Sequence, residues 1–358
     1  MPRLSLPPIV AEPIARSERW TGRIAGLDLT RAIALIGMFA VHVGDAGTRG
    51  ADADGWHWLW IADGRSSAIF AVLAGVTISL LAAKDAVGPR HAALRVATRG
   101  VLLIAAGYAL AAVGTSVDVI LTNLGLMFVL VIPLTRWRAP SLLAAAAVAA
   151  TIGSFAARLA SDRLDGVAVI EKLVSEHYPA IAWAAYVLVG MAIGKTDLRA
   201  PWNAFKAVWI GTLTAAAAYG AGILCGGATP WSGVRAASTV GATWASVAPH
   251  SNTSFEIIGN TGVALAVIGA CVAVARSSLG ILPLLAFGSM SLTMYTVHVL
   301  IIAAVGGQIV WQPSNVALVA MTTVLIAAAT VWRIAVGAGP LERLLTRAST
   351  RVADALAD

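Results

Sequence analysis

Charged residues are scarce in this chain of 358 residues: they form 12% of it, while hydrophobic residues form 58%. A soluble domain has about 25% charged residues, so the composition excludes an ordinary soluble fold. Cysteine is rarer still, with two residues, which excludes a disulfide framework and a cysteine-rich metal site. The sequence also lacks a glycine-rich nucleotide loop and a clear internal repeat, so neither a phosphate-loop enzyme nor a repeat protein is indicated.

Long apolar segments are the main feature that is present. Runs of about 20 apolar residues, the length that crosses a bilayer as a helix, recur from residue 30 onward. The ten-residue alternation typical of outer-membrane barrels is missing. The sequence therefore predicts an all-α, polytopic helical membrane protein. About ten spans are expected, at residues 29–46, 59–82, 94–115, 118–135, 140–157, 178–194, 205–225, 254–275, 282–305 and 315–337.

The basic residues indicate the orientation of these spans, because cytoplasmic loops collect Lys and Arg. With both termini in the cytoplasm, 19 of the 25 basic residues lie on the inner side. Residues 1–26 are then a flexible cytoplasmic tail, residues 27–338 the transmembrane domain, and residues 339–358 an amphipathic cytoplasmic segment. We expect a multi-pass protein of the cell membrane (plasma or inner), with the lipid bilayer as partner. The net charge of +7 belongs to membrane loops, so a nucleic-acid partner is not expected.

Ionisable residues mark both ends of the first span, in the stretch LDLTRAIALIGMFAVHVGDAG (residues 27–47). Asp28 and His42 are separated by a rise of about 21 Å along a helix. Asp45 follows His42 by about one turn and could orient the imidazole or stabilise its charge, as a general base requires. The alternative is a lone interfacial histidine that meets lipid headgroups.

Three further groups of polar residues fall on the outer side. Arg65 and Ser66, in WIADGRSS, begin the second span, where Arg65 could steady a carboxylate, phosphate or oxyanion or simply reach the headgroups. Tyr295 and His298 share one stripe of the ninth span, and interhelical hydrogen bonds are their alternative role. The stretch APHSNTSFE supplies a third group, which could bind a substrate: His250, Ser251 and Glu256. The alternative is that Thr253 or Ser254, together with Glu256, caps the next helix.

Basic residues form a rim on the inner side, which suits a polyanionic cytosolic ligand. For most of them, anchoring to anionic lipid is the simpler explanation. Arg31 and Arg333 are exceptions because each lies within an apolar segment, although Asp28 could simply neutralise Arg31. The rim also includes Arg95 and Arg99.

These motifs resemble those of a known family. GLDLTRAIALIGMFAVH is similar to the opening signature of heparan-α-glucosaminide N-acetyltransferase-like proteins and their bacterial YeiB-type relatives, with Asp28, Arg31 and His42 at matching positions and Ala32 in place of a glycine. YPAIAWAAYVLVGMAIGKTDL, PHSNTSFEIIGNTGVALAV and GSMSLTMYTVHVLI resemble later motifs in the same order. The resemblance covers about residues 23–346.

The resemblance implies a transmembrane acyltransferase that uses acyl-CoA as co-substrate and needs no metal. It implies His42 as the catalytic base or acyl carrier. The other residues expected to support catalysis are Asp45, Arg65, Ser66 and His298. The residues expected to bind acyl-CoA are Asp28, Arg31, Arg95, Arg99 and Arg333. An extracytoplasmic glycan or glycolipid acceptor is expected to meet His250, Ser251, Glu256 and Tyr295.

Two other classes of function remain open. A secondary transporter of a small polar solute would use the same outer polar cluster as a solute or proton site. A catalytically silent membrane scaffold is the other class. The sequence also leaves open the acceptor, the acyl group, the choice between direct transfer and an acyl-histidine intermediate, and whether the chain forms a homodimer.

Overall fold

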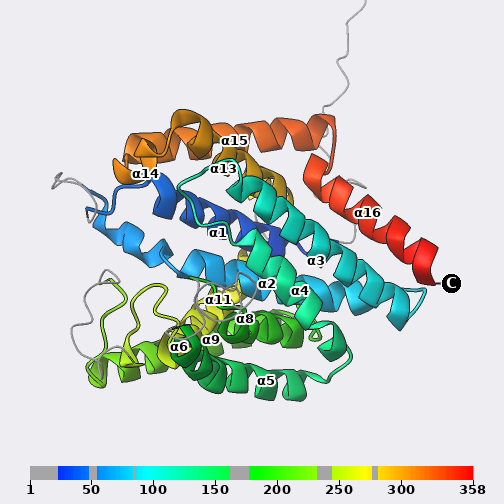
Figure 1. Ribbon diagram of the computed structural model, residues 1–358, viewed down its shortest axis with the longest axis horizontal. Coiled ribbons are helices and arrows are strands. Elements are labelled where there is room, and N and C mark those ends of the chain that lie inside the picture. Colours follow the sequence, from blue (N-terminus) through cyan, green and yellow to red (C-terminus); the bar gives the residue numbers. More distant parts are fainter. Residues whose placement is uncertain are drawn as a thin grey trace, which may run out of the picture.

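The computed structural model describes residues 23–47, 55–83, 85–161, 177–231, 244–275 and 281–357, and its regular elements there are helices (Figure 1). Most of the expected cytoplasmic tail lies outside these residues. The long helices are α1 (Ala25–Val43), α2 (Arg65–Ala83), α3 (Pro89–Ala111), α9 (Pro201–Leu224), α11 (Ser254–Val274), α15 (Asn315–Ala335) and α16 (Pro340–Ala357). The shorter elements are η2 (His57–Ala62), α4 (Leu121–Leu130), η3 (Ile132–Leu134), α5 (Ala139–Val148), η4 (Ala149–Gly153), α6 (Ser154–Ser161), α8 (Ala180–Ile193), α12 (Leu282–Ser289), α13 (Ser291–Val305) and α14 (Gln308–Trp311).

The prediction of a polytopic helical membrane protein is confirmed, but the count of ten spans is not. In the described part of the chain, seven stretches of helix are long and apolar enough to cross a membrane, or eight if the bent pair α12–α13 counts as one span. The expected spans 118–135 and 178–194 contain α4 and α8, apolar helices of 10 and 14 residues. These are about 15 and 21 Å long, shorter than the ~30 Å hydrocarbon core. Pro133 follows α4, and Pro179 precedes α8, so proline limits both helices.

Helices α1 and α2 form the centre of the bundle. Helix α1 packs against α2, α11, α12 and α15, while α2 packs closely against α8. At the α2–α8 crossing, a Cβ added to Gly190 would lie 3.0 Å from the Cα atom of Gly75 and would overlap the backbone of Val72. The two backbones are therefore in direct contact, as is typical where small residues face each other in membrane bundles.

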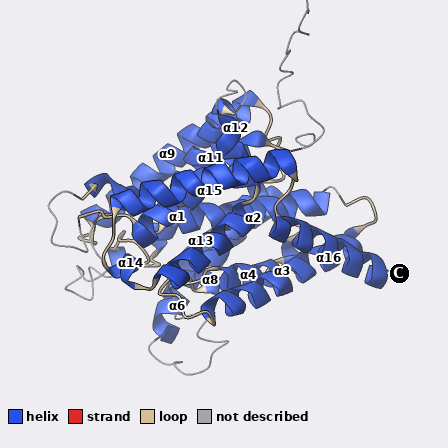
Figure 2. Cartoon of the chain, turned by 90° about the horizontal axis from the view of Figure 1, so that it is seen from above, coloured by secondary structure: helices blue, strands red, loops and turns tan. Residues whose placement is uncertain are grey.

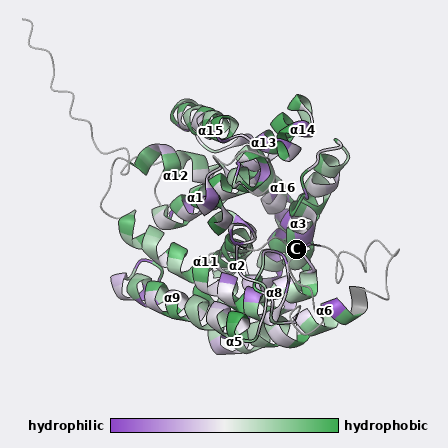
Figure 3. Cartoon of the chain, turned by 90° about the vertical axis from the view of Figure 1, so that its left-hand side faces the viewer, coloured by the Kyte–Doolittle hydropathy of each residue, from purple (hydrophilic) through white to green (hydrophobic). Residues whose placement is uncertain are grey.

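Helices α9 and α15 present large apolar side chains outward. In each helix, 17% of the most apolar window is buried, and residues such as Leu213 on α9 and Val331 on α15 are more than half exposed. Figure 3 shows α15 coloured mostly as hydrophobic. Exposed apolar surface on this scale fits contact with lipid tails rather than water.

The ninth expected span is broken rather than continuous. Helices α12 and α13 meet at an angle of 80°. Glu342 of α16 forms hydrogen bonds at the point where they meet. Its carboxylate accepts hydrogen bonds from the amides of Leu292 and Thr293 at 2.8 and 3.1 Å, and from the Thr293 hydroxyl at 2.6 Å. Because the first amides of a helix have no partner within it, Glu342 satisfies the start of α13 and compensates its positive dipole end.

Helix α16 lies alongside the first half of α3 (Figure 2). Arg99 of α3 donates to the hydroxyls of Ser349 and Thr346 at 3.2 and 3.3 Å. Near the start of α3, His91 Nε2 lies 3.0 Å from the carboxylate of Asp354. The segment that was expected to be amphipathic is therefore a helix docked on the bundle through polar contacts.

Candidate functional site

Asp28, in the first turn of α1, is buried, and two arginines share its carboxylate. Arg23 donates to its two oxygens at 2.8 and 2.6 Å, and Arg31 donates at 2.8 Å. Arg31 also donates to the hydroxyl of Thr77 on α2 at 3.1 Å. A buried carboxylate needs such partners, which explains how an acid is tolerated in an apolar helix. Two guanidiniums on one carboxylate leave a net positive charge.

These residues line a cavity of 460 Å³, which we call the inner cavity after the predicted orientation. Its walls come from α1, α2, α3, α16 and the α12–α13 break. Its charged lining residues are Arg23, Asp28, Arg31, Arg95, Arg99 and Glu342. Four of the five residues expected to bind acyl-CoA thus meet in one cavity. The fifth, Arg333, is buried on α15 and does not line it.

The arginines of α3 differ in their partners. Arg95 Nη1 lies 3.2 Å from the carboxylate of Asp85, so its charge has an opposite charge beside it. Arg99 donates to hydroxyls of α16, which are neutral. Arg99 therefore contributes positive charge that its hydrogen-bond partners do not compensate, and such charge attracts an anionic ligand.

At the other end of α1, two histidines that are distant in sequence form a pair. His42 Nδ1 lies 3.0 Å from His298 Nε2 of α13, and the rings are stacked with centroids 5.3 Å apart. His298 is fully buried, between the rings of Phe39 and Tyr295, at centroid distances of 4.6 and 5.0 Å. Packing on both sides fixes the His298 ring, which in turn orients His42.

Asp45 has other partners than the ones expected from helical spacing. Helix α1 ends at Val43, so Asp45 does not continue its face. The Asp45 carboxylate accepts a hydrogen bond from the Gly47 amide at 2.7 Å, and its backbone exchanges two hydrogen bonds of 3.0 Å with the Asn315 side chain. Asp45 thus ties the end of α1 to the start of α15, and the ring partner of His42 is His298.

Arg65 is also placed differently from the expectation. It is 4% exposed and donates to the carbonyls of Trp60 and Asp63 at 3.2 and 2.9 Å. Its guanidinium lies over the rings of Trp60 and Tyr219. These contacts fix the turn between η2 and α2, and Arg65 itself does not line the cavity beside His42.

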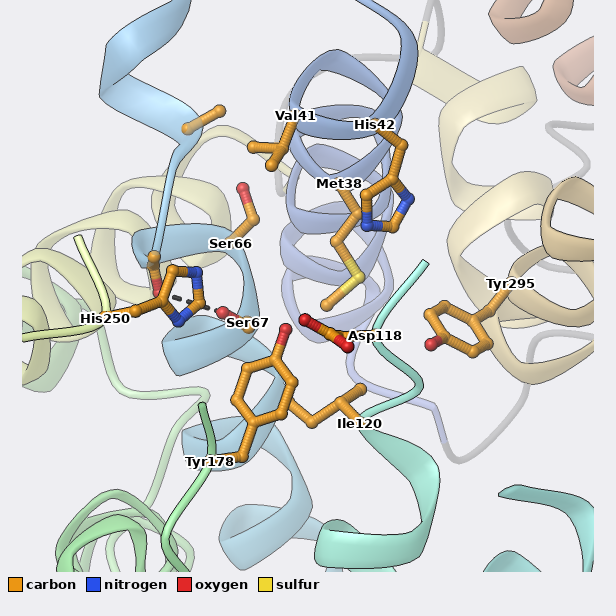
Figure 4. A pocket seen from close by; sticks show the side chains of 12 residues that line it. Met38, Val41, His42, Ser66, Ser67, Asp118, Ile120, Tyr178, His250 and Tyr295 are labelled. Carbon is orange, nitrogen blue, oxygen red and sulfur yellow. Dashed lines mark hydrogen bonds between the residues drawn. The ribbon is translucent and has the colours of Figure 1, made fainter. Parts of the chain in front are cut away.

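That cavity, which we call the outer cavity, is small and polar. Its volume of 30 Å³ is room for roughly two water molecules. Figure 4 shows side chains from separate elements converging on it: His42 and Met38 from α1, Ser66 and Ser67 from α2, and Tyr295 from α13. Loop residues close the other side: Asp118, Tyr178 and His250. Of the expected site residues, His42, Ser66, Tyr295 and His250 therefore share one cavity.

The loop that carries His250 is held by Glu256 of α11. The Glu256 carboxylate accepts hydrogen bonds from the amides of His250 and Asn252 at 2.8 and 2.6 Å and from the Ser251 hydroxyl at 3.1 Å. Glu256 and Ser251, expected to contact an acceptor, thus shape the loop, while His250 faces the cavity. Thr253 caps α11 by accepting a hydrogen bond from the Glu256 amide, which was the alternative role considered for this stretch.

Burial would lower the pKa of His250, but neighbouring carboxylates outweigh it. Asp63 lies 3.6 Å from His250 Nε2 and raises the pKa most, with smaller contributions from Glu256 and Asp118. The net effect is a pKa above the ordinary histidine value. Because a raised pKa favours the protonated ring, His250 supplies positive charge to the outer cavity.

Sequence reasoning missed several lining residues, among them Asp118, Tyr178 and Glu342. Asp118 and Tyr178 lie in short loops, in GTSVD and EHYP, and Glu342 lies in GPLERLL. Their only sequence signal is a polar residue beside an apolar span, which many loop residues share. None of the clusters of His, Cys, Asp and Glu among the described residues has a metal-binding arrangement.

Comparison with known families identifies the family of the chain. A family model described as heparan-alpha-glucosaminide N-acetyltransferase, catalytic, matches residues 23–222, more than half of the chain. The match begins at Arg23, one of the two arginines that share the Asp28 carboxylate, and extends through most of α9. It therefore includes the arginines of α1 and α3 as well as His42. No curated protein and no solved structure matches the chain. The chain belongs to the heparan-alpha-glucosaminide N-acetyltransferase catalytic family.

Proposed function

We propose that this protein is a membrane acyltransferase that receives an acyl group from acyl-CoA at the inner cavity and transfers it to an acceptor at the outer cavity. Family membership supports the transferase class. The observation that carries the proposal is the position of α1, which has the arginine-lined cavity at its start and the His42–His298 pair near its end. A group that enters from one side can therefore react near the other.

The inner cavity has the chemistry that a CoA donor requires. The donor is a polyanion, and arginine binds phosphate through paired, charge-assisted hydrogen bonds. Four arginines and two carboxylates line the cavity, so its net charge is positive. The volume of 460 Å³ lies within the usual range of about 300–1,000 Å³ for small-molecule sites. Arg31 and Arg99 are the residues that we expect to contact phosphate.

The length of α1 fits an extended donor. Arg31 and His42 are eleven residues apart, which corresponds to a rise of about 16 Å. The long arm of CoA is of comparable length, so its thioester can approach the outer half of α1 while its phosphates stay with the arginines. Leu35 and Phe39 fill the intervening part of α1 and are fully buried, so the arm requires side chains there to move.

His42 is the residue that we expect to act as base. When the Nδ1–H of His42 donates to His298 Nε2, the Nε2 atom of His42 carries the lone pair that can accept a proton from the acceptor. His298 is held by packing on both sides, so it fixes the tautomer and the orientation of His42. The same geometry allows His42 to carry the acyl group itself.

The same predicted orientation supports an expectation for the acceptor and for the location of the protein. The outer cavity accepts only a small protruding group such as a hydroxyl or amine, and hydroxyls and a carboxylate surround it. An extracytoplasmic glycan or glycolipid carries such groups. We therefore place the protein in the plasma or inner membrane, with the acceptor on the outer face.

One observation favours transport as a second candidate. Broken helices often line the substrate site of secondary transporters, and the break between α12 and α13 borders the inner cavity. In that case the arginines would bind an anionic solute that crosses the membrane unchanged.

Turnover of labelled acyl-CoA by the purified protein tests the proposal. Wild type, His42→Ala and the control His57→Ala would each receive radiolabelled acetyl-, propionyl- or succinyl-CoA with a cell-envelope extract. His57 is exposed and outside both cavities. We expect label on a glycan or lipid with wild type and the control, and a loss of about 10²–10⁴-fold in His42→Ala. Failure of wild type to bind any acyl-CoA would refute the proposal, and solute flux in proteoliposomes would then favour transport.

A further inference from the structure

The two ring nitrogens of His250 differ in their partners. Nε2 lies 3.6 Å from a carboxylate oxygen of Asp63. Nδ1 is buried and has no hydrogen-bond partner among the described residues. Buried polar nitrogens are nearly always hydrogen-bonded, and an unsatisfied one costs free energy. Because the ring lines the outer cavity (Figure 4), a ligand atom in that cavity is the natural partner for Nδ1.

The backbone at His250 is held in an uncommon conformation. His250 has φ of 59° and Asn252 has φ of 52°, in the left-handed region that residues other than glycine seldom occupy. Glu256 binds both of their amides, and Trp183 Nε1 donates to the Asn252 side chain at 2.7 Å. Strain of this kind persists only where the surroundings enforce it, and it concentrates at functional sites.

The charges around His250 favour a cation. Asp63 faces it from the turn before α2, Glu256 from α11 and Asp118 from the loop before α4. His177 and Tyr178, from the segment before α8, contact its ring edge-on at centroid distances of 5.9 and 5.5 Å. Three carboxylates around one imidazole keep the ring protonated to higher pH than in water.

We propose that His250, as an imidazolium, is a catalytic residue that donates from Nδ1 to the oxyanion formed during acyl transfer, with Asp63 and Glu256 as its positioning residues. This inference rests on the proposed function and assigns a second histidine to it. The outer cavity has room for roughly two water molecules, so His42 and His250 face the same few atoms. Their environments differ, since His42 pairs with another imidazole ring and His250 with a carboxylate, and such a difference separates a base from an acid.

The reaction balances with these two residues alone. The acceptor oxygen or nitrogen attacks the thioester carbonyl carbon and gives its proton to His42, while the carbonyl π pair moves onto oxygen. The His250 Nδ1–H donates to that oxyanion. When the carbonyl re-forms, the carbon–sulfur bond breaks with its electron pair on sulfur. The proton on His42 then passes to the thiolate, so both histidines return to their starting states.

The placement of Arg65 strengthens the assignment. Arg65 was the expected oxyanion donor, but its guanidinium is bound to the carbonyls of Trp60 and Asp63 and lies over two aromatic rings. Its role is to hold the turn that carries Asp63. His250 is therefore the cationic side chain that faces the cavity from the loop side.

Two measurements on the full-length protein test the inference. In the first, the ring nitrogens of isotope-labelled histidine are titrated by NMR, with His250→Gln identifying the signal. We expect His250 to titrate above the ordinary histidine pKa of about 6.5, and Asp63→Asn to lower its midpoint. In the second, turnover is measured with acetyl-CoA and envelope extract. We expect His250→Gln to lower kcat about 10²–10³-fold with KM for acetyl-CoA little changed, and His57→Gln to match wild type.

The pH profile separates a catalytic cation from a merely structural residue. The wild-type rate should fall as pH rises through the pKa of His250, and Asp63→Asn should move that fall to lower pH. Titration of His250 at or below the ordinary histidine pKa of about 6.5 would overturn the inference without reference to turnover. If wild type turns over and His250→Gln keeps its rate and pH profile, this inference fails while the proposed function stands. Absence of wild-type turnover overturns both.

Discussion

Replacing Gly75 by alanine should loosen the crossing of α2 and α8. A Cβ on Gly75 would lie 2.8 Å from the Met191 amide nitrogen and would overlap the Val187 carbonyl oxygen. Ordinary contact begins at 3.4 Å, so the two helices must move apart by at least 0.6 Å. Over-packing of this kind costs about 1–3 kcal/mol. Because Trp183 of α8 also holds Asn252, we expect turnover to fall as well.

The matched control is Gly220→Ala on α9. An added Cβ there has no atom within 4 Å, and alanine favours a helix over glycine by up to about 1 kcal/mol. Unfolding of the purified proteins in mixed micelles, followed by loss of helix signal, gives both free energies. We expect Gly75→Ala to be less stable than wild type and Gly220→Ala to be equally or more stable. Equal stability of the two variants would refute the claim that the helices touch at Gly75.

Two more predictions concern the inner side. Arg99→Gln should weaken acyl-CoA binding roughly tenfold by loss of one charge-assisted contact. The control Arg90→Gln removes an exposed arginine outside the cavity and should leave the Kd unchanged. Calorimetry on both variants measures the two Kd values, and equal effects would contradict a contact between Arg99 and phosphate. Burial would raise the pKa of Asp85, but hydrogen bonds from His91 and Arg95 and from two backbone amides hold it below its ordinary value. The stabilisation that Asp85 provides should therefore be complete at neutral pH and be lost as pH falls below about 4. Asp85→Asn should lack this loss of stability in acid. The free energy of unfolding, measured for both proteins at several pH values, tests the prediction.

Composition and apolar run length were enough to predict a helical membrane protein, because burial in lipid leaves little choice of fold. They did not predict how far each helix runs. Residues 118–135 and 178–194 are mostly apolar, yet α4 ends three residues before Pro133 and α8 begins directly after Pro179. The 80° bend in residues 282–305 is stabilised by Glu342, which lies 50 residues after Leu292 in the chain. No local sequence pattern predicts this contact.

The candidate site was likewise predictable only in part. Asp28 and Arg31 sit one turn apart, so their pairing follows from helical spacing. His42 and His298 were each selected as polar residues in apolar spans, but their contact joins positions 256 residues apart. Asp45 was chosen by continuing the helical spacing past Val43, where α1 ends. Local periodicity thus predicts partners within a helix, while contacts between helices require the fold.

The docking of α16 has a consequence for how the protein is made. Helix α16 supplies Glu342 and Thr346 to the inner cavity, so the cavity walls remain incomplete until residues 340–357 have left the ribosome. A nascent chain that already contains every residue matched by the family model has Arg95 and Arg99 but lacks the wall of the inner cavity that α16 provides. The inner cavity is therefore completed only when α16 folds back onto α3.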